Sequence, residues 1–458
     1  GNVIKGSSTK GYRAAGVPGN VAGFELALAK YGTMTRGAVI APAIRLARRG
    51  FVLEQADVDM LANATEAFRA DAPSAAIFLD RGQPLTAGRR LVQADLARTL
   101  RRIAKGGADA FYRGPIADAI VAASTRGNGI IAKADLERYE VRERTPIECD
   151  YRGYHIVSAP PPSSGGVIVC EILGILEGYP LRELGFRSAQ AVHYQIEAMR
   201  HAYVDRNSYL GDPDFVTNPI ERLLDKGYAA KIRAAIDPTR AGISSAIKPG
   251  VAPHEGTSTT HYSIVDKDGN AVAVTYTLNE WFGAKVTVAG TGIIMNNEMD
   301  DFTVKPGVPN VYGLVQGEAN AIAPGKRPLS SMSPTIVSRD GKPVLVIGSP
   351  GGSRIITVVV HLILNTVDYG MNLQEAIDAP RFHQQWLPEG TYVEEFALSP
   401  DTRRMLADMG HRFTDARPWS HAIGIVVGSP SLGSDARGEN RFFGANDPRR
   451  NIGLALGY

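Results

Sequence analysis

The stretch "TTHYSIVDKDGNAVAVTYTLN", residues 259–279, predicts a β-hairpin with an unusual start. Apolar and β-branched residues lie on both sides of an Asp-Gly turn, which is the pattern of two antiparallel strands joined by a tight loop. Hydroxyl side chains crowd the beginning of the first strand, at Thr257, Ser258, Thr259 and Thr260. A buried strand should avoid such a cluster and a surface strand does not need it, so the cluster requires a chemical explanation.

The turn fixes which residues of the two strands face each other. Asp266-Lys267-Asp268-Gly269 fits a type I turn in which the glycine takes the left-handed position. This three-residue loop places Thr259 opposite Thr277, whereas a two-residue loop would place Thr260 there. Two threonines facing each other can simply form a cross-strand pair, worth roughly 0.2–1 kcal/mol.

The residues before the hairpin suggest a second explanation. From about residue 235 to 258 the chain is rich in Pro and Gly without sustained periodicity, so we expect an exposed connection that tolerates cutting. A cut between Ser258 and Thr259 would give Thr259 a free α-amine of pKa about 7.7–8 beside its hydroxyl. A threonine paired with its own terminal amine is a recognised activated nucleophile. The same hydroxyl could attack the preceding carbonyl and cut the chain itself.

An acyl-transfer nucleophile also needs hydrogen-bond donors for the oxyanion that develops during the reaction. The stretch "VLVIGSPGGSRIITVV" predicts a strand, a glycine-rich turn and a helix. Gly351 and Gly352 can therefore present consecutive backbone N–H groups at a helix N-terminus. A phosphate cradle is the competing interpretation, but its Gly-Lys-Ser/Thr ending is missing. A purely structural strand-to-helix turn stays open.

Other function classes lack their motifs. The chain has no Gly-x-Ser-x-Gly elbow, and its nine histidines show no His-Glu-x-x-His spacing, so no serine hydrolase, metal site or cofactor is expected. His261 fits a hydrogen-bonded structural role better than that of a base. No apolar run reaches the ~18 residues of a membrane span. A net charge of +3 and dispersed basic residues do not indicate a nucleic-acid partner. The densest basic patch has helical spacing and should be a solvated helix face: Arg98, Arg101, Arg102 and Lys105.

Hydrophobic periodicity divides the chain into a helix-rich first half and a strand-rich second half. Helices gathered on hairpin-linked strands indicate an α+β fold, with an αββα layering as one form of it. Cys149 and Cys170 are expected to be buried thiols rather than a disulfide framework. The helices predicted before the hairpin cover residues 21–32, 37–50, 55–70, 93–114, 116–124, 132–140, 167–178 and 188–206, and one strand is predicted there, at residues 154–160.

Taken together, these stretches resemble the γ-glutamyltranspeptidases of the N-terminal-nucleophile hydrolase superfamily. The resemblance extends from about Gly16 to Tyr458. It implies a four-layer αββα sandwich and a proenzyme that cuts itself between Ser258 and Thr259. The parts 1–258 and 259–458 would then remain associated in one globule as a large and a small subunit. The matching stretches include "GVPGNVAGFELALAKYG", "YLGDPDF", the hairpin, "GIIMNNEMDDF", "KPGVPNVYGL", "KRPLSSMSPTIV", "GSPGGSRII" and "APRFHQQWLP".

The resemblance also implies roles for individual residues. A γ-glutamyl group ends in an ammonium and a carboxylate, so its binding site needs anions at one place and donors at another. Asp301 and its neighbour Asp300 could alternatively form a turn pair after a strand. The implied roles are hydrogen bonding to the nucleophile by Thr277, contact with the donor's amino-acid group by Asn279, ammonium binding by Glu298 and Asp301, carboxylate binding by Ser330 and Ser331, an oxyanion hole at Gly351 and Gly352, and a lid-like loop carrying Tyr312.

Two departures from the family pattern affect specificity. The family's N-terminal segment, with an arginine that holds the donor carboxylate, would precede Gly1. Recognition by Ser330 and Ser331 alone therefore looks incomplete, because hydroxyls cannot supply a bidentate charged contact. In addition, Trp281 lies in a bulky Glu-Trp-Phe run after the hairpin. It either restricts the acceptor site or belongs to a packed aromatic cluster. Trp419, in a predicted loop, has no assigned role.

The resemblance implies γ-glutamyl transfer and hydrolysis. Glutathione or glutamine would donate the γ-glutamyl group to Thr259, and water or an amino acid or peptide would accept it. It also implies periplasmic or secreted residence. Two alternatives keep the fold: an acylase for glutaryl or cephalosporin side chains, and an inactive homologue.

Overall fold

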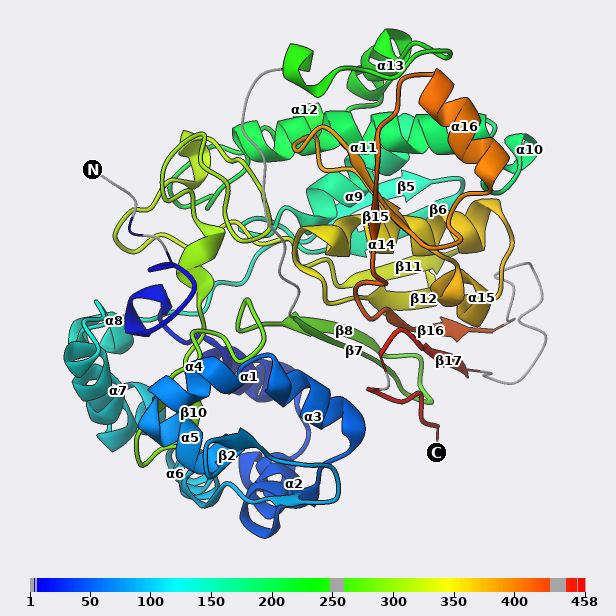
Figure 1. Ribbon diagram of the computed structural model, residues 1–458. Coiled ribbons are helices and arrows are strands. Elements are labelled where there is room, and N and C mark those ends of the chain that lie inside the picture. The colour runs from blue at the N-terminus through cyan, green and yellow to red at the C-terminus, as the bar shows by residue number, and fades with distance from the viewer. Residues whose placement is uncertain (1–3, 5, 248–258, 429–441, 451, 458) are drawn as a thin grey trace. The chain divides into compact units, whose positions relative to one another are not determined.

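The computed structural model describes residues 4, 6–247, 259–428, 442–450 and 452–457 (Figure 1). Two compact units are present, and each combines two stretches of chain. The helical unit consists of Gly1–Glu143 and Thr277–Asp300, and the sheet unit consists of Arg144–Tyr276 and Asp301–Tyr458. Both units therefore use residues from before and after position 258. The division into subunits 1–258 and 259–458 stays a prediction. No helix in the described ranges is long and apolar enough to span a membrane.

The helical unit is held together by two clusters of buried apolar side chains. One cluster includes Phe111, Ile116 and Ile120, and the other includes Phe68 and Phe78. Its helices are α1 (Asn20–Tyr31), α2 (Arg36–Arg49), α3 (Gln55–Ala62), α4 (Thr65–Ala70), α5 (Ala72–Phe78), α6 (Ala94–Tyr112), α7 (Pro115–Arg126) and α8 (Lys133–Glu137). Its short strand pairs are β1 (Phe51–Val52) with β4 (Arg90–Leu91), β2 (Leu79–Asp80) with β3 (Gln83–Pro84), and β9 (Thr287–Val288) with β10 (Ile293–Ile294).

The basic patch predicted on residues 98–105 lies on α6. All four of its side chains are exposed, and Arg98 pairs with Asp95 one turn earlier. This confirms a solvated helix face.

The sheet unit is built around six antiparallel strands in the order β17-β16-β12-β11-β6-β5. Two of these strands come from the helix-rich half of the sequence, and only the second of them was predicted. The strands are β5 (Ile147–Tyr151), β6 (Tyr154–Ser158), β11 (Thr335–Arg339), β12 (Lys342–Gly348), β16 (Ile423–Val427) and β17 (Phe442–Asn446).

The predicted hairpin is confirmed as β7 (Thr260–Val265) and β8 (Ala271–Tyr276). Thr260 pairs with Tyr276, so Thr259 and Thr277 are the next positions outward, as the three-residue loop predicts. Gly269 has a φ of 85°. The hairpin contacts β12 and β16, whose edges are already paired within the sheet, so it stacks on the sheet face.

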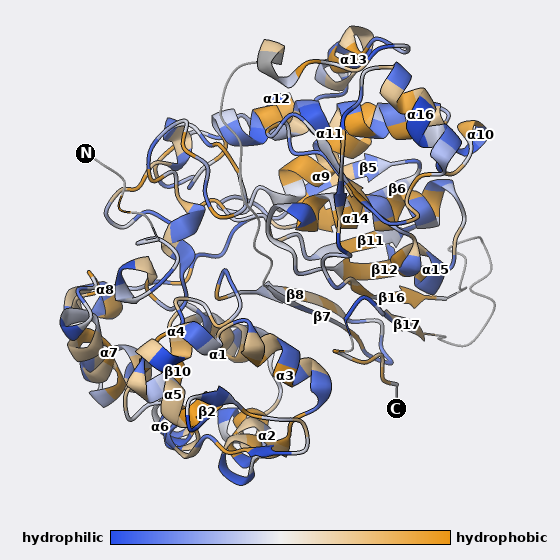
Figure 2. Ribbon diagram, viewed as in Figure 1, coloured by the Kyte–Doolittle hydropathy of each residue, from blue (hydrophilic) through white to orange (hydrophobic). Residues whose placement is uncertain are grey.

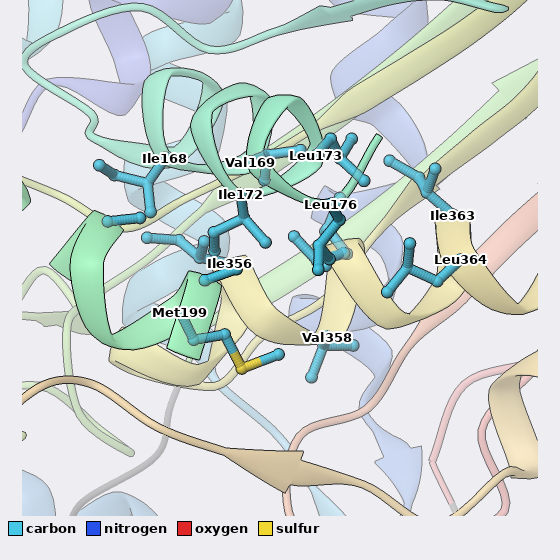
Figure 3. Close-up of a cluster of buried hydrophobic side chains, with 14 of the residues drawn as sticks. Ile168, Val169, Ile172, Leu173, Leu176, Met199, Ile356, Val358, Ile363 and Leu364 are labelled. Atoms are coloured by element: carbon cyan, nitrogen blue, oxygen red, sulfur yellow. The ribbon is translucent and has the colours of Figure 1, made fainter. Parts of the chain in front are cut away.

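The opposite face of the six-stranded sheet is covered by two apolar helices, α9 (Gly165–Leu176) and α14 (Ile355–Ile363). Figure 2 shows the hydrophobic colouring of both helices. In Figure 3, Ile172 of α9 lies beside Ile356 of α14, with Met199 of α11 (Ala189–Tyr209) below them. Fully burying such side chains contributes roughly 1.5–3 kcal/mol each. This apolar core fixes the sheet that carries the hairpin.

A second helical layer covers α9 and contains α11 (Ala189–Tyr209) and α13 (Lys226–Ala235). The fold is thus a mixed α+β fold, with helices on one sheet face and the hairpin on the other. A helical layer beyond the hairpin, which would complete four layers, stays a prediction. Further α-helices and strands of this unit are α10 (Leu181–Leu184), α12 (Ile220–Leu223), α15 (Leu373–Asp378), α16 (Pro400–Asp408), β13 (Phe382–His383), β14 (Thr391–Glu394) and β15 (Phe413–Ala416).

The expectation of two free thiols was wrong. Cys149 of β5 and Cys170 of α9 form a disulfide, with their Cα atoms 5.9 Å apart. The two residues lie 21 positions apart, and they meet because the chain turns back through β6 before α9 packs on β5. Since β5 was not predicted, the sequence pattern could not reveal this contact.

Candidate active site

Two contacts between the hairpin and β12 locate the predicted nucleophile. Ser263 Oγ donates a hydrogen bond to the Val346 carbonyl at 3.2 Å, and the His261 ring lies against Gly348. A step of two residues toward the start of β7 therefore corresponds to a step of two residues toward the end of β12. Continuing this antiparallel progression brings Thr259 level with the turn that follows β12. That turn contains Gly351 and Gly352.

His261 is a structural residue, as predicted. Its ring is buried, with Nδ1 2.8 Å from Thr275 Oγ1 and Nε2 3.0 Å from Ser263 Oγ. Burial lowers the pKa of His261 to about 3, so the ring is neutral. A Cβ atom at Gly348 would overlap this ring, which explains why a glycine ends β12.

The backbone conformation and the close packing of the turn require glycine at positions 351 and 352. Gly351 has a φ of 141° and Gly352 a φ of 58°, a region that side chains rarely adopt. A Cβ atom on Gly351 would overlap Ser420 Oγ, and one on Gly352 would overlap the Tyr312 ring. The turn leads through a 3₁₀ turn, Gly352–Arg354, into α14. Glycine at both positions therefore lets the turn pack directly against Ser420 and Tyr312.

Tyr312 is buried and tied to the same turn. Its ring covers Gly352, and its carbonyl accepts a hydrogen bond from Gln385 Nε2 at 3.1 Å. Gln385 Oε1 in turn accepts the hydroxyl of Ser353 at 2.7 Å. Gln385, which the sequence analysis missed, therefore links the Tyr312 loop to the residue that follows the two glycines.

Ser330 and Ser331 lie five and four residues before the start of β11, near the end of the sheet from which the glycine turn emerges. Ser330 Oγ accepts the backbone N–H of Met332 at 3.1 Å. Ser331 Oγ accepts a hydrogen bond from Arg206 Nη2 at 2.9 Å. Arg206 lies on α11 and was also missed by the sequence analysis. The helix α11 buries polar as well as apolar side chains, so no hydrophobic stripe in the sequence marked Arg206 as a buried cation.

Arg206 is fully buried, and burial lowers its pKa to about 10, while Tyr203 and Asp301 favour its charged form. The guanidinium is therefore charged at neutral pH. The Asp301 carbonyl accepts hydrogen bonds from Gln316 Nε2 at 3.1 Å and from Asn320 Nδ2 at 2.7 Å. The sheet unit thus gathers the serine pair, the buried cation and Asp301 into one polar region.

The helical unit contains a second cluster of predicted site residues. Asn279 has a φ of 72°, and its backbone N–H donates to Thr277 Oγ1 at 2.8 Å. Its Nδ2 donates to the Asn297 carbonyl at 2.9 Å. Asn297 is fully buried and also receives the Glu280 N–H, so it fastens the end of the hairpin segment to the residues that precede Glu298.

Glu298 is half-buried, and one of its carboxyl oxygens is enclosed. Its Oε1 has no hydrogen-bond partner among the residues that the structure describes, and burial raises its pKa to about 7. Asp300, by contrast, accepts the Ser8 hydroxyl at 2.7 Å and has a structural partner. An enclosed carboxylate of this kind suits a cationic ligand group.

The bulky run after Asn279 contains two differently placed aromatic residues. Phe282 packs against Phe68 and Phe78, with ring centroids 5.1 and 5.8 Å away. Trp281 is half-buried. Trp419, unassigned from sequence, is buried in the sheet unit, with the Arg354 guanidinium 4.3 Å from its ring.

One group of side chains has metal-ligand character within the described ranges: His193, Glu197 and His411. His193 Nδ1 lies 2.8 Å from His411 Nε2, and His193 Nε2 lies 2.8 Å from the Asp237 carbonyl. The carbonyl requires an N–H at Nε2, so Nδ1 accepts a hydrogen bond from His411. This arrangement is a neutral histidine pair. It involves none of the predicted site residues.

Ser258, on the other side of the predicted cleavage point, lies outside the described residues. The other predicted residues form two sets. Thr259, Asp301, Tyr312, Ser330, Ser331, Gly351 and Gly352 belong to the sheet unit, and Thr277, Asn279, Trp281 and Glu298 belong to the helical unit. The chain joins the two sets covalently between Tyr276 and Thr277 and between Asp300 and Asp301.

Comparison with known proteins gives consistent matches. The model of the γ-glutamyltranspeptidase family matches residues 2–456. The chain is 68% identical to a glutathione hydrolase proenzyme of Pseudomonas sp. (strain A14), covering all of this chain and 80% of that protein. It is 50% identical to the proenzyme of the same name from Escherichia coli (strain K12), covering all of this chain and 78% of that protein.

Solved structures agree with the family match. A cephalosporin acylase from Bacillus halodurans aligns with a TM-score of 0.81 at 27% identity, covering 98% of this chain and 80% of that chain. The γ-glutamyltranspeptidase of Helicobacter pylori aligns with a TM-score of 0.53 at 43% identity, covering 54% of this chain and 72% of that chain.

Proposed function

The chain belongs to the γ-glutamyltranspeptidase family, and we propose that it is a self-processing γ-glutamyltransferase and glutathione hydrolase. The observation that carries this proposal is the register of the hairpin on the sheet. It aligns the start of β7 with the glycine turn after β12, so a threonine hydroxyl and a pair of backbone donors come to one end of the sheet.

Processing begins with the hydroxyl of Thr259. It attacks the Ser258 carbonyl, and the peptide nitrogen leaves as the new α-amine, so an ester replaces the peptide bond. Water then hydrolyses this ester. Thr259 becomes the first residue of the small subunit, with both a hydroxyl and a free amine.

Catalysis uses the same residue. The α-amine accepts the hydroxyl proton while Thr259 Oγ1 attacks the γ-amide, and the proton passes to the leaving amine. Gly351 and Gly352 donate backbone N–H groups to the oxyanion, and Thr277 hydrogen-bonds the nucleophile. The resulting γ-glutamyl ester is transferred to water, an amino acid or a peptide. Glutathione and glutamine are the proposed donors.

Recognition of the donor divides between its two charged groups. Glu298 and Asp301 bind the ammonium together with the amide of Asn279, and Ser330 and Ser331 bind the carboxylate. The enclosed Glu298 carboxyl supports this assignment, because its unpartnered oxygen gains a charged hydrogen bond when an ammonium binds. Tyr312 shields the glycine turn, and Trp281 borders the acceptor.

The alternative is an acylase for glutaryl or cephalosporin side chains. The structural similarity to a cephalosporin acylase is the observation that favours it. A glutaryl group lacks the ammonium, so the enclosed Glu298 favours a γ-glutamyl donor. Turnover of γ-glutamyl and glutaryl p-nitroanilides distinguishes the two, and we expect the γ-glutamyl compound to be preferred. A catalytically silent homologue would turn over neither compound.

Substitution of the nucleophile tests the proposed processing. We expect Thr259→Ala to remain one chain on a denaturing gel, while the wild type separates into two. A Thr259→Ala protein that still separates would show that Thr259 does not cut the chain. We also propose that the two subunits stay associated and that the protein resides in the periplasm or outside the cell. The Cys149–Cys170 disulfide supports an oxidising compartment.

A further inference from the structure

Arg206 donates hydrogen bonds to Ser331 of the serine pair and to Ser164, a residue that is itself bonded to Ser330. Its Nη2 donates to Ser331 Oγ at 2.9 Å, and its Nε donates to Ser164 Oγ at 2.9 Å. Ser164 in turn donates its hydroxyl to the Ser330 carbonyl at 2.8 Å, and its backbone N–H donates to the same carbonyl at 2.8 Å. The guanidinium therefore holds Ser331 directly and Ser330 through one intermediary.

The remaining bonds of Arg206 fix the orientation of the guanidinium. Its Nη1 donates to Asn207 Oδ1 at 3.0 Å and to Gln316 Oε1 at 3.3 Å. Gln316 Nε2 donates to the Asp301 carbonyl. Four of the five N–H groups of the side chain are thus used, one within α11 and three to other segments of the sheet unit. A planar, fully buried group with these bonds cannot rotate freely.

The hydrogen bond from Arg206 determines which way the Ser331 hydroxyl points. A guanidinium only donates, so Ser331 Oγ must be the acceptor, and its own hydrogen must be directed elsewhere. The same argument applies to Ser330, whose Oγ accepts the Met332 N–H. Both hydroxyls are therefore oriented as donors, as a carboxylate ligand requires. A buried positive charge behind Ser331 further favours an anion in front of it.

We propose that Arg206 is a positioning residue for donor recognition, which orients the Ser331 hydroxyl toward the donor's α-carboxylate. This inference rests on the proposed function, in which the serine pair binds that carboxylate. Arg206 does not contact the donor itself, and its effect passes through Ser331. The contribution should therefore appear in the binding of donors that carry the carboxylate and should vanish for donors that lack it.

The experiment compares two donors that differ only in that group. γ-Glutamyl p-nitroanilide carries the carboxylate, and 4-aminobutyryl p-nitroanilide lacks it. For Arg206→Met, we expect KM for the first compound to rise about ten- to a hundredfold, with a much smaller change in kcat. KM for the second compound should change less than about twofold. The double variant Arg206→Met/Ser331→Ala should bind the first donor no worse than Ser331→Ala.

Arg200→Met is the matched control, because Arg200 is another buried arginine on α11. It pairs with Glu197 and Glu389 and has no bond to the serine pair. We expect it to leave the ratio of the two KM values unchanged, even if it lowers the melting temperature. If Arg206→Met does not fold, Arg206→Lys tests the inference instead. Lysine retains the charge without the planar guanidinium, so the ratio of the KM values for the two donors should shift in the same direction as expected for Arg206→Met.

Two results would overturn the inference: an equal loss for both donors, or additive effects of the Arg206 and Ser331 substitutions. Failure of the proposed function looks different. In that case the wild-type protein would not discriminate between the donors, and Ser331→Ala would leave both KM values unchanged. Discrimination that depends on Ser331 but not on Arg206 would contradict the inference alone.

Discussion

Glu298 and Ser331, the side chains proposed to bind the two charged groups of the donor, differ in their hydrogen bonding. The Glu298 carboxyl has an enclosed oxygen with no partner among the described residues, and the Ser331 hydroxyl already accepts a hydrogen bond from Arg206. Each group therefore has the hydrogen-bonding state that its proposed ligand group requires. Neither state could be predicted from residue type, because both depend on what surrounds the side chain.

Ionisation of the Glu298 carboxyl should make ligand binding depend on pH. Its folded pKa of about 7 lies above its ordinary value, so the carboxyl is neutral below this pH and charged above it. We expect the inhibition constant of L-glutamate, the hydrolysis product, to rise toward tenfold per pH unit below about pH 6. Binding of this product requires no proton transfer at Thr259. Glu298→Gln should bind weakly with a flat profile. A flat wild-type profile from about pH 5.5 to 8 would refute the assignment.

Gly352 gives a prediction for the chemical step. Gly352→Ala would push a Cβ atom into the Tyr312 ring and displace the backbone N–H that is proposed to bind the oxyanion. We therefore expect kcat to fall by a factor of about 10²–10³. Gly341→Ala is the control, since this turn glycine has a φ of 73° but no atom close to its Cβ position. Its strain is similar and its kcat should be nearly unchanged. Equal kcat values for both variants would contradict an oxyanion hole at Gly352.

At the scale of secondary-structure elements, the packing of the hairpin on the sheet determines which part of the sheet unit lies level with Thr259. Gly348→Ala would overlap the His261 ring, so we expect it to lower the free energy of unfolding by about 1–3 kcal/mol. Gly174→Ala in α9 is the control, because its Cβ would lie 3.8 Å from that of Ala229, an ordinary contact. Thermal melting compares the two. A Gly348→Ala protein as stable as the control would show that the hairpin does not rest on this contact.

The disulfide joins β5 to α9. Loss of both cysteines, in Cys149→Ala/Cys170→Ala, should lower the free energy of unfolding by roughly 3 kcal/mol, because the bridge closes a loop of 21 residues in the unfolded chain. Titration with a thiol reagent under denaturing, non-reducing conditions checks the premise, and no reactive thiol is expected. Two reactive thiols per chain would contradict the bridge.

The sequence predicted single helices and strands better than the contacts that these elements make with one another. The hairpin register followed from the residues of the three-residue turn, and the helices α1, α2, α6 and α11 followed from apolar periodicity. The strand β5, "IECDY", alternates apolar and polar residues but is only five residues long and follows a helix-rich stretch, so it was overlooked and its disulfide was missed as well. Arg206, Asn297 and Gln385 were missed because their roles come from contacts between segments more than 15 residues apart in the chain.

For the whole molecule, the order of the chain and the order in space differ. The strands β5 and β6 precede the predicted cleavage point, yet they pair into one sheet with β11 and β12, which follow it. The helical unit likewise combines residues from both sides. Two chains produced by cleavage would therefore share a hydrogen-bonded sheet and remain together. The disulfide lies within the first part and does not link the two chains.

The most direct test of the central claim is mass spectrometry of the purified active protein under denaturing, non-reducing conditions. We predict two chains, the second of which begins with an unmodified Thr259, and a γ-glutamyl adduct on that residue when turnover is stopped by acid. A single uncut chain that turns over γ-glutamyl p-nitroanilide at the full rate would contradict the claim that Thr259 is both nucleophile and base.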